Sequence, residues 1–590
     1  MNPLGWMWRS VFCSRTMFKT FLSRKFFSLL LSSSVGLLVI TVLTLSDSVI
    51  AGVMLGEDAV AAICLVTPAY SLAAFFGCLI SLGVPIIYNR SMGEFDKEKA
   101  DRSFSFGLLM SVATGLVLYA VFMLIGDAYL RFYEPSTIVF DAAKDYFFWY
   151  KFTFLLLPLS TLMREMVLAD GDETLSMISG VAQIVGNIVC SIVFAKFIGI
   201  AGIGLGSFVG TSAAVLVSFA HVFRKGNSLK LGFYFSFNWL VDVAKYSAID
   251  ASSYLFLACF IAAMNRFISF AYGPEMLVLG AVILFVKELQ LLFDGVGGAF
   301  TPLMNIYLGE ESYDAVKKCY SLSQKTAVVE GVILTLLMIL VAPFIVKLYD
   351  ISNPVAYAYA VEGVRIEVLG LVFVSLLYML SSYYLLIEKI KLGVMMCALR
   401  DVLVVTPICI VLGYFFGVYG MFAGVAISPA VAYVITVLYI RLRYGKDNYP
   451  LLLSEKLKGF NHKFYEFKLD PKSIVETQQQ VEKYLCENGI DRKISFKVKL
   501  LIEDLFMLIY EKNGVDKEVY AECTVIVRDT GVQVITKDDG VLFDLSSDDV
   551  VAGSIVEFMV SGYMEKLKDN KKYLTTMSYN RNTFRINYEV

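Results

Sequence analysis

The sequence predicts a polytopic α-helical membrane protein with twelve transmembrane helices in two six-helix repeats, followed by a cytoplasmic two-layer α/β domain. Three observations predict this fold class. Of the 590 residues, 57% are hydrophobic and only 18% are charged, whereas soluble domains carry about 25% charged residues. Long uncharged stretches follow one another up to residue 440, and related segments recur at a spacing of about 217 residues.

The predicted spans are apolar stretches long enough to cross a bilayer, which takes about 20 residues of helix. Uncharged stretches lie at 26–46, 59–89, 103–126, 174–195, 197–220, 368–387 and 402–440. The last is long enough for two spans, with a natural break at 415–420. Four further spans contain charges, at roughly 146–168, 246–271, 275–303 and 327–349. The total is even, so both termini are expected on the same side.

The distribution of Lys and Arg places both termini in the cytoplasm. Basic residues precede the first span and recur in every second connection, whereas the alternate loops are short and poor in Lys and Arg. The acidic loop at 170–173 is the one exception among the inner segments. Lys and Arg mark cytoplasmic loops, and this distribution gives the orientation. The many predicted spans indicate a multi-pass protein, which we expect in the plasma (inner) membrane. The first helix is too long for a cleaved signal peptide.

Composition also sets the predicted domains. A cytoplasmic N-terminal segment (1–25) precedes an N-lobe (26–225), a C-lobe (226–445), a linker (446–463) and a cytoplasmic α/β domain (464–590). That last domain holds 22 acidic and 17 basic residues, and the rest of the chain holds 31 and 34. Such a near-neutral balance argues against nucleic acid as a partner. Ten Cys without metal-like spacing and two His predict neither a structural zinc site nor a disulfide framework.

The internal repeat predicts two related lobes. Residues 197–202 recur at 415–420, and residues 89–94 recur at 305–310. Two six-span repeats in the same orientation imply an axis along the membrane normal, and transporters of this kind bind substrate between the lobes. A chance recurrence of glycine-rich helix connections is the alternative.

Several of these segments resemble the multidrug and toxic compound extrusion (MATE) transporters. Residues 45–52 and 59–62 are similar to the family's first helix and its exit, and residues 93–100 to its Gly-x-x-x-x-x-x-Ala turn. Residues 186–188 resemble its fifth helix, and residues 397–400 its eleventh. The resemblance implies a secondary antiporter, not an enzyme, that exports drugs or small organic cations in exchange for protons or sodium ions. It implies membrane lipid as a further partner and no cofactor.

Two other functions stay open at this point. One is a lipid-linked saccharide flippase of the same superfamily. The other is a membrane sensor that uses the C-terminal domain as its output.

Ionisable residues inside the spans are the candidates for the transport site, because a charge at the bilayer centre costs about 2.5–3.5 kcal/mol on insertion scales. Asp47 lies within the first apolar run, and the resemblance implies a cation-responsive acid there. A helix cap at the outer interface is the alternative. Asn187 could offer an amide oxygen to a cation or could pack between helices. Ser191 stands where proton-responsive members carry a second acid, so the coupling ion stays open.

The eighth span carries Lys287, Glu288 and Asp294. On a straight α-helix Lys287 and Asp294 lie on nearly the same face and could share a cavity. Glu288 points elsewhere and matches an acid that the family carries in this helix. The alternative for these residues is an ion pair with Arg266 or Arg400. Arg400 itself matches a family arginine, and it either serves transport or only snorkels to the cytoplasmic surface.

The C-terminal residues predict strands at 465–469, 518–528, 531–537, 563–568, 571–579 and 582–588, with helices at 472–488, 493–513 and 549–561. This order resembles the histidine-kinase-like ATPase fold of anti-sigma-factor kinases. Residues 501–507 stand at that family's Glu-x-x-x-Asn helix, and residues 538–544 at its Asp-x-Gly-x-Gly-Phe-Asp loop. The resemblance implies Glu503 as general base, with Asp538 and Gly540 contacting the nucleotide.

Two departures make ATP binding by this domain doubtful. Met507 replaces the magnesium-binding Asn, and a thioether is a poor magnesium ligand. Leu542 replaces the second glycine of the loop. We therefore expect a docking or regulatory domain, which contacts either the inner loops of the transporter or a cytoplasmic protein partner. An unrelated α/β architecture is the remaining alternative.

Overall fold

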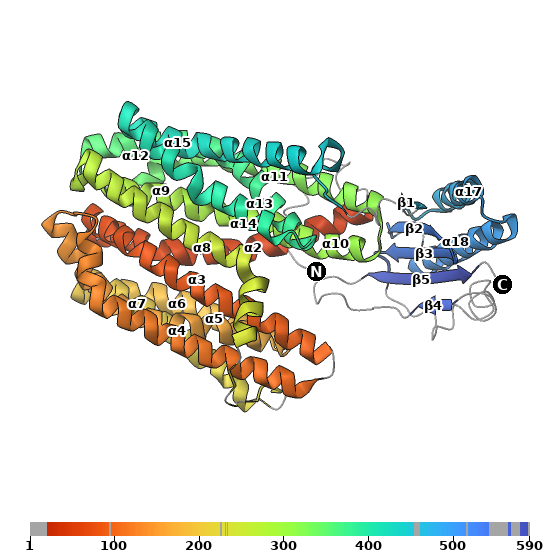
Figure 1. Ribbon diagram of the computed structural model, residues 1–590, viewed down its shortest axis with the longest axis horizontal. Helices are drawn as coiled ribbons and strands as arrows, with labels where there is room; N and C mark the ends of the chain where they lie inside the picture. Colours follow the sequence, from red (N-terminus) through yellow and green to blue (C-terminus); the bar gives the residue numbers. More distant parts are fainter. Residues whose placement is uncertain are drawn as a thin grey trace. The chain divides into compact units, whose positions relative to one another are not determined.

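The computed structural model describes residues 20–93, 96–224, 227–230, 232, 234–235, 237–453, 461–514, 517–541, 565–567 and 579–587 (Figure 1). The chain divides into two compact units. The membrane unit comprises Val35–Asp294 and Ala327–Arg443. The tail unit comprises Met1–Ser34, Gly295–Thr326 and Tyr444–Val590, so it joins the C-terminal domain to short pieces of helix.

Helices make up nearly all of the described chain up to residue 444. The first half contains α2 (Phe21–Leu55), α3 (Glu57–Gly93), α4 (Lys97–Arg131), α5 (Thr137–Ala169), α6 (Glu173–Ile198), α7 (Ile200–Phe219) and η1 (Ala220–Phe223). Side chains cap several of these helices: Asp96, Ser136 and Asp172 each accept a hydrogen bond from a backbone N–H in the first turn. Such caps satisfy donors that the helix itself leaves unpaired.

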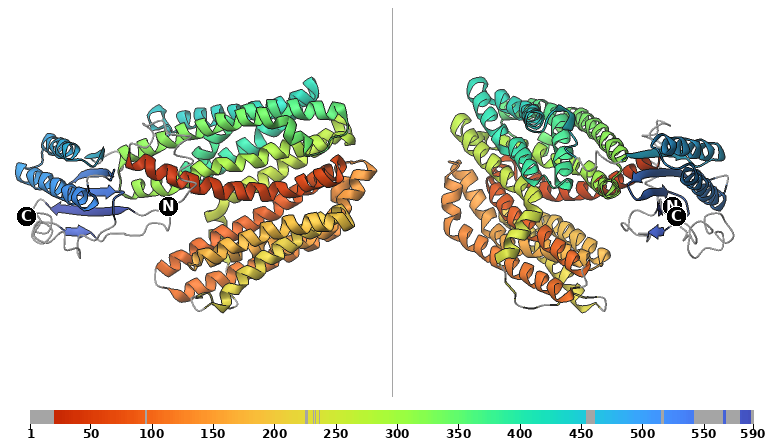
Figure 2. Two further views of the ribbon diagram at one scale, coloured as in Figure 1. Left: turned by 180° about the vertical axis from the view of Figure 1, so that it is seen from behind. Right: turned by 45° about the vertical axis from the view of Figure 1, so that its right-hand side comes forward.

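The second half is more interrupted than the first. It contains α8 (Phe237–Tyr272), η2 (Pro274–Met276), α9 (Val278–Leu289), η3 (Gln290–Phe293), α10 (Asp294–Gly309), α11 (Tyr313–Lys347), α12 (Pro354–Glu367), η4 (Val368–Gly370), α13 (Leu371–Leu386), α14 (Ile390–Ala398), η5 (Leu399–Leu403), α15 (Val405–Tyr444) and η6 (Lys446–Asn448). In the membrane unit α3–α7 form one bundle, and α8, α9 and α11–α15 form another (Figure 2).

Eleven helical segments of the described chain are long and apolar enough to cross a membrane, so the structure does not itself give the predicted count of twelve. The last of them, Ile390–Tyr444, is 55 residues long. Inside it Gly417 has φ 69° and ψ −157°, which is not helical. This glycine lies in the break predicted at 415–420.

The backbone repeats at the spacing found in the sequence. Helices α4 and α11 are both 35 residues long and begin at residues 97 and 313. Gly199, which separates α6 from α7, has φ 60° and ψ −140°, close to the conformation of Gly417 at the equivalent place. Glu134 and Asp350, 216 residues apart, both adopt positive φ. Three pairs therefore agree on a spacing of 216 to 218 residues, which favours a true internal repeat over a chance recurrence.

The acidic loop between α5 and α6 holds one end of the first bundle together. Asp170 accepts hydrogen bonds from Tyr88 and from the backbone N–H and hydroxyl of Ser228, and Asp170 and Asp172 flank the two ring nitrogens of His221 at 2.7 and 3.1 Å. Burial alone would raise the pKa of Asp170, but these hydrogen bonds lower it below its ordinary value. Asp170 and Asp172 thus form hydrogen bonds and ion pairs that stabilise the fold. This role explains why an acidic loop occurs among the predicted cytoplasmic segments, which are otherwise basic.

The tail domain, residues 461–587, is built on an antiparallel sheet. Its strands are β1 (Asn461–Lys468), β2 (Tyr520–Arg528), β3 (Gly531–Asp538), β4 (Glu565–Leu567) and β5 (Asn580–Asn587), in the order β1-β2-β3-β5-β4. Helices α17 (Pro471–Glu487) and α18 (Arg492–Asn513) both lie on one face of this sheet (Figures 1 and 2). A closed apolar core between helices and sheet includes Leu501, Leu505, Val525 and Val534, each fully buried.

The predicted tail elements agree with the described ones within a few residues, except that β1 begins four residues earlier than expected. The helix expected at 549–561 and the strand expected at 571–579, apart from residue 579, lie outside the described residues, as does Leu542. The resemblance to the histidine-kinase-like ATPase fold stays a prediction.

Candidate functional site

A cavity of about 80 Å³ lies inside the membrane unit. Helices α2, α3, α5, α6 and α7 form most of its wall, and α9 and Tyr349 complete it. Among the described residues that line it, Asp47 and Glu288 are the only charged ones. The aromatic lining residues are Tyr70, Tyr146, Tyr150, Phe285 and Tyr349. The volume exceeds what one water needs and is well below the roughly 300–1,000 Å³ of drug-sized pockets.

Asp47 is held by hydrogen bonds from three helices. Its Oδ2 accepts from the Tyr146 hydroxyl of α5 at 2.9 Å and from the Ser207 hydroxyl of α7 at 2.6 Å. Its Oδ1 accepts from the Asn187 amide of α6 at 3.1 Å. All three donors are neutral, so the network satisfies the carboxylate without supplying a counter-charge.

Local structure explains why Asp47 points inward. Helix α2 runs on to Leu55, eight residues beyond Asp47, and Asp47 is 9% exposed. The alternative of a cap at the helix end is therefore wrong. Ser46 donates to Asn187 Oδ1 at 2.9 Å, so two consecutive residues of α2 engage the same amide.

The structure brings together Asp47, Asn187 and Glu288 among the predicted site residues. Asp47 and Asn187 are bonded directly, and Glu288 lines the same cavity from α9 with an exposure of 9%. Neither Arg266 nor Arg400 forms the ion pair with Glu288 that was the alternative. Arg266 Nη1 lies 2.6 Å from Glu134, and Arg400 pairs with Asp401.

Lys287 and Asp294 do not line this cavity. The prediction that they share one face assumed a regular α-helix from residue 287 to residue 294, and the helix is not regular there. Residues 290–293 form the 3₁₀ segment η3, with about three residues per turn instead of 3.6, and this shifts the faces of the following helix. Lys287 is 7% exposed and places its Nζ 5.1 Å from the centroid of the Phe260 ring.

Arg400 is buried, with 2% exposure, so it does not snorkel to the surface. It donates from Nε and Nη2 to both oxygens of Asp401, at 2.8 and 2.6 Å, and its guanidinium stacks 3.7 Å from the Tyr378 ring centroid. Both charged residues lie in η5, a π-helical turn that interrupts the regular helix. Bidentate pairing and stacking thus fix Arg400, which is not among the residues lining the cavity.

Sequence reasoning missed three residues of interest. Tyr146 and Ser207 complete the Asp47 network, and neither carries a charge that would have marked it as a candidate in the sequence. The spacing of Ser207 and Thr211, four residues apart and both lining the cavity, could have indicated a polar helix face. Glu367 was missed because the uncharged stretch begins at residue 368. It is 2% exposed, and no described residue donates a hydrogen bond to either of its carboxylate oxygens.

The residues predicted to bind nucleotide are already engaged in the tail domain. Asp538 is 1% exposed, and its Oδ1 accepts from the Gly540 backbone N–H at 3.0 Å and the Asn580 amide at 2.8 Å. Burial raises the pKa of Asp538 to about 7, against the lowering effect of these bonds. Glu503 is half-buried on α18, and Met507 packs against the apolar core. Met507 offers magnesium only a thioether, and Asp538 uses one of its two carboxylate oxygens for hydrogen bonds within the domain.

The described residues contain no group of three or more His, Cys, Asp or Glu that could hold a metal ion. A helical bundle pair with an internal repeat, two facing carboxylates and a small internal cavity is the architecture of a two-lobed membrane transporter. The comparisons with known proteins agree with this class.

The MatE family model matches residues 33–193. An inward-facing structure of a multidrug resistance MATE family transporter of the MOP superfamily is similar, with a TM-score of 0.64 and 18% identity over 68% of this chain and 94% of that one. An outward-facing structure of such a transporter gives a TM-score of 0.58 and 18% identity over 71% and 95%. No curated protein matches the chain.

A MOP superfamily transporter from Pyrococcus furiosus is also similar, with a TM-score of 0.59 and 18% identity over 71% of this chain and 95% of that one. The binding pocket of that protein is described as having reversed polarity, which suggests a different function for it. At this identity the likeness shows the fold, and the chain therefore has a MATE-type fold. The matched proteins are transporters and not enzymes, in agreement with the prediction from the sequence.

Proposed function

We propose that the chain is a secondary active antiporter that exports drugs or other cationic organic compounds in exchange for protons or sodium ions. One observation carries this proposal: the cavity contains two carboxylates and no basic residue among its described lining residues. A buried charge without a counter-charge is strongly unfavourable. Each carboxylate must therefore bind a proton or a cation when it is shielded from water.

Exchange follows if the same carboxylates serve both ligands. A cationic compound approaching the lining aromatic rings gains from ionised Asp47 and Glu288 and from cation–π contacts. A proton or sodium ion arriving at Asp47 cancels the negative charge and weakens that attraction. Binding of the coupling ion and of the substrate are then mutually antagonistic, which antiport requires.

The hydrogen bonds at Asp47 favour a proton over sodium in the described arrangement. Asn187 turns its amide nitrogen, not its oxygen, toward the carboxylate. Sodium is a hard cation that prefers oxygen ligands, so Asn187 and the Ser207 hydroxyl would both have to reorient around it. A proton requires only that one hydroxyl partner turn from donor to acceptor.

We further propose the domain organisation that the sequence predicts. The segment Ile390–Tyr444 crosses the membrane twice, with the turn at Gly417, which gives twelve spans. The N-lobe is residues 26–225 and the C-lobe 226–445, the linker is 446–463, and the tail is 464–590. Both termini lie in the cytoplasm, and the protein resides in the plasma membrane. Asn187, Lys287, Asp294 and Arg400 remain proposed contributors to transport.

The test of this function is counter-transport in proteoliposomes containing the purified full-length chain. Imposed proton or sodium gradients should drive ethidium or norfloxacin movement, and collapsing the gradient should stop it. Movement of a lipid-linked saccharide without any cation transport would instead indicate the flippase alternative. If a well-folded chain moves none of these substrates, the proposal is wrong.

Glu288→Gln is expected to lower ion-driven transport by about tenfold or more, because one of the two carboxylates of the cavity is lost while its shape is kept. The matched control is Glu98→Gln. Glu98 belongs to an exposed pair with Arg102, and its side chain is 76% exposed. Initial rates in the same proteoliposome assay decide the comparison. Equal rates for the two variants would show that Glu288 has no special role.

The full-length chain is expected not to bind ATP with micromolar affinity and not to hydrolyse it. Asp538 is committed to Gly540 and Asn580, and Met507 supplies no magnesium ligand. Phosphoryl transfer needs magnesium to neutralise the developing charge. Calorimetry with ATP and magnesium checks the first statement and phosphate release the second. A micromolar dissociation constant would show that another residue replaces the missing Asn.

A further inference from the structure

The tail domain buries both faces of its sheet. The apolar core with α17 and α18 covers one face. The other face of β2 carries Tyr520, Glu522, Thr524 and Ile526, each at most 6% exposed. An antiparallel sheet commonly leaves one face to solvent. Within the tail unit, the groups that contact this second face come from the start of α2 and from the turn between α10 and α11.

A buried charge cluster forms the centre of this contact. Lys537 of β3 places its Nζ 2.6 Å from Glu310, which follows the end of α10, and 3.5 Å from Glu522. Arg581 of β5 donates to the second oxygen of Glu310 at 3.0 Å. Tyr307 of α10 donates to Glu522 at 2.7 Å. The side chains of Lys537, Glu310 and Glu522 are 3%, 1% and 1% exposed.

This cluster binds the tail domain to the α10–α11 turn, because its positive and negative charges balance only when the sheet and the turn are in contact. Glu310 belongs to the turn, whereas Glu522, Lys537 and Arg581 belong to the sheet. Together they make two acids and two bases. Removing one partner of a buried ion pair leaves an uncompensated charge and is strongly destabilising. Glu310 of the turn therefore supplies the negative charge that neutralises the second base of the sheet.

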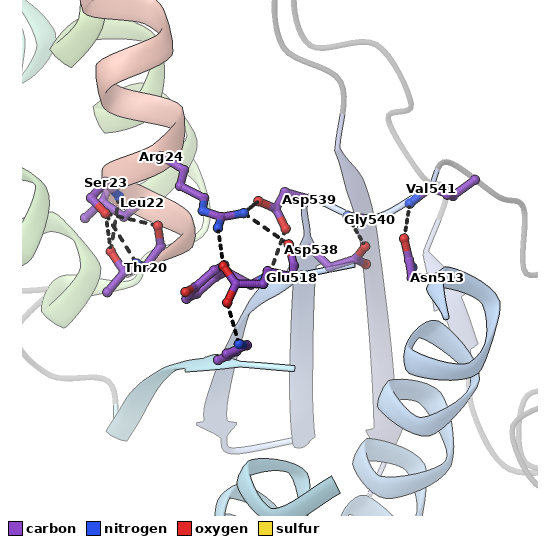
Figure 3. A network of polar contacts seen from close by, with 12 residues as sticks. Thr20, Leu22, Ser23, Arg24, Asn513, Glu518, Asp538, Asp539, Gly540 and Val541 are labelled. Carbon is purple, nitrogen blue, oxygen red and sulfur yellow. Dashed lines mark hydrogen bonds and ion pairs between the residues drawn. The ribbon is translucent and has the colours of Figure 1, made fainter. Parts of the chain in front are cut away.

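The start of α2 makes the second contact with the sheet (Figure 3). Arg24 donates to Asp539 at 3.3 Å and to the backbone carbonyl of Glu518 at 3.1 Å, and its guanidinium lies 4.0 Å from the Tyr520 ring centroid. Asp539 also accepts from the Tyr520 backbone N–H at 2.7 Å. The loop at residues 538–540, which resembles a nucleotide-binding loop, is thus contacted by Arg24 of α2.

The edge of the contact adds further polar pairs. Arg528 of β2 lies 2.6 Å from Glu311 in the turn. Glu466 of β1 accepts from the Leu22 backbone N–H at 3.3 Å and lies 3.6 Å from Lys318 of α11. Glu466 is therefore held by α2 and α11 at once.

The two helix ends that the sheet contacts also touch each other. A Cβ built on Gly298 of α10 would lie 2.6 Å from the Ser33 hydroxyl, and one on Gly295 would lie 2.7 Å from that of Ser34. At Gly298 the added Cβ would also lie 2.9 Å from the Ser33 Cβ, so a side chain there would push α2 and α10 apart. The start of α2 and α10 thus pack closely, and the sheet contacts both of them.

We propose that the tail domain is an intramolecular clamp, whose second sheet face binds the start of α2 and the α10–α11 turn simultaneously. The occupant of this face is the chain itself, and not a nucleotide or a separate cytoplasmic protein. The helix that begins at the clamp is the one that carries Asp47. Movement of the start of α2 away from α10 must therefore break the Arg24 contacts or the Glu310 cluster.

The test separates the tail from the rest of the chain after folding. A protease recognition sequence is inserted within residues 454–460 of the full-length chain, which is purified in detergent on an N-terminal tag and then cleaved. We expect the wild-type tail to stay bound through size-exclusion chromatography. Glu310→Lys should reduce the retained tail by about tenfold or more, since it puts a third base beside Lys537 and Arg581.

Two further variants guard against a trivial loss of folding. Glu311→Arg and Arg528→Glu should each weaken retention, and the double variant should restore it, because the exchanged charges attract again. The matched control is Lys472→Glu on α17, whose side chain is 86% exposed and lies on the other face of the sheet. A wild-type tail that dissociates on cleavage would overturn the proposal. So would equal retention in Glu310→Lys and the control.

Discussion

Asp47→Asn is expected to reduce gradient-driven transport to the background of empty liposomes, with expression and membrane insertion close to wild type. The side chain keeps its size, so Tyr146, Asn187 and Ser207 still pack around it. What is lost is the carboxylate of this network, whose negative charge a proton or a cation would neutralise. Initial rates of ethidium efflux under an imposed proton or sodium gradient measure the effect.

The neighbours of Asp47 provide graded controls. Tyr146→Phe and Ser207→Ala each remove one hydrogen bond to Oδ2, and each should slow transport without abolishing it. Loss of a hydrogen bond to a charged group costs about 1.5–3 kcal/mol, so the pH or sodium dependence should shift as well. Wild-type rates in a well-inserted Asp47→Asn protein would contradict the proposed role. The coupling carboxylate would then have to be sought elsewhere.

The sequence was sufficient to predict the parts of the fold that depend on local pattern. Apolar stretches and glycine turns placed the helices, because a span must satisfy its backbone hydrogen bonds within itself. The break at residues 415–420 was predicted because the uncharged stretch 402–440 is long enough for two spans, and Gly417 has the backbone conformation that a turn needs. Asp47 and Asn187 could be selected because a polar group in an apolar run requires a partner.

What the sequence could not show is how distant helices pair their polar groups. The bond between Ser207 and Asp47 joins residues 160 positions apart, and a serine in a helix gives no sign of such a partner. The predicted relation of Lys287 to Asp294 is limited by a different feature. It assumed a regular helix, and the 3₁₀ turn between them leaves no strong trace in composition. The contacts of the tail depended on Arg24 and Glu310, which look like ordinary interfacial charges in the sequence.

The two repeats share a backbone but differ in their polar groups. Asn265 stands 218 residues after Asp47, and it donates to the backbone carbonyl of Cys64 at 3.0 Å instead of lining the cavity. The second repeat buries its charged residues elsewhere, in the Arg400–Asp401 pair and at Lys287 and Glu367. The repeat thus duplicated the helical frame, and only the first copy carries an acid at the Asp47 position. Coupling centred on Asp47, with Glu288 as the second carboxylate of the cavity, is consistent with this asymmetry.

Gly206→Ala is expected to destabilise the first bundle and to disturb the Asp47 network together. A Cβ at Gly206 of α7 would lie 2.2 Å from the hydroxyl and 2.4 Å from the backbone nitrogen of Ser191 on α6. Because backbone atoms are involved, the two helices must separate. Overpacking of this kind typically costs about 1–3 kcal/mol, which corresponds to a fall in melting temperature of roughly 2–12 °C for a bundle of this size.

The effect should reach transport because Gly206 precedes Ser207, whose hydroxyl lies 2.6 Å from Asp47. A shift of α7 by a few tenths of an ångström lengthens this bond, so we expect slower transport even at temperatures where the variant is folded. The matched control is Gly180→Ala on α6, where an added Cβ has no heavy atom within 4 Å. Alanine is the better helix former by about 1 kcal/mol, so this control should be neutral or slightly stabilising. Thermal unfolding in detergent and transport rates are compared for both variants, and equal behaviour would mean that α6 and α7 are not in close contact at Gly206.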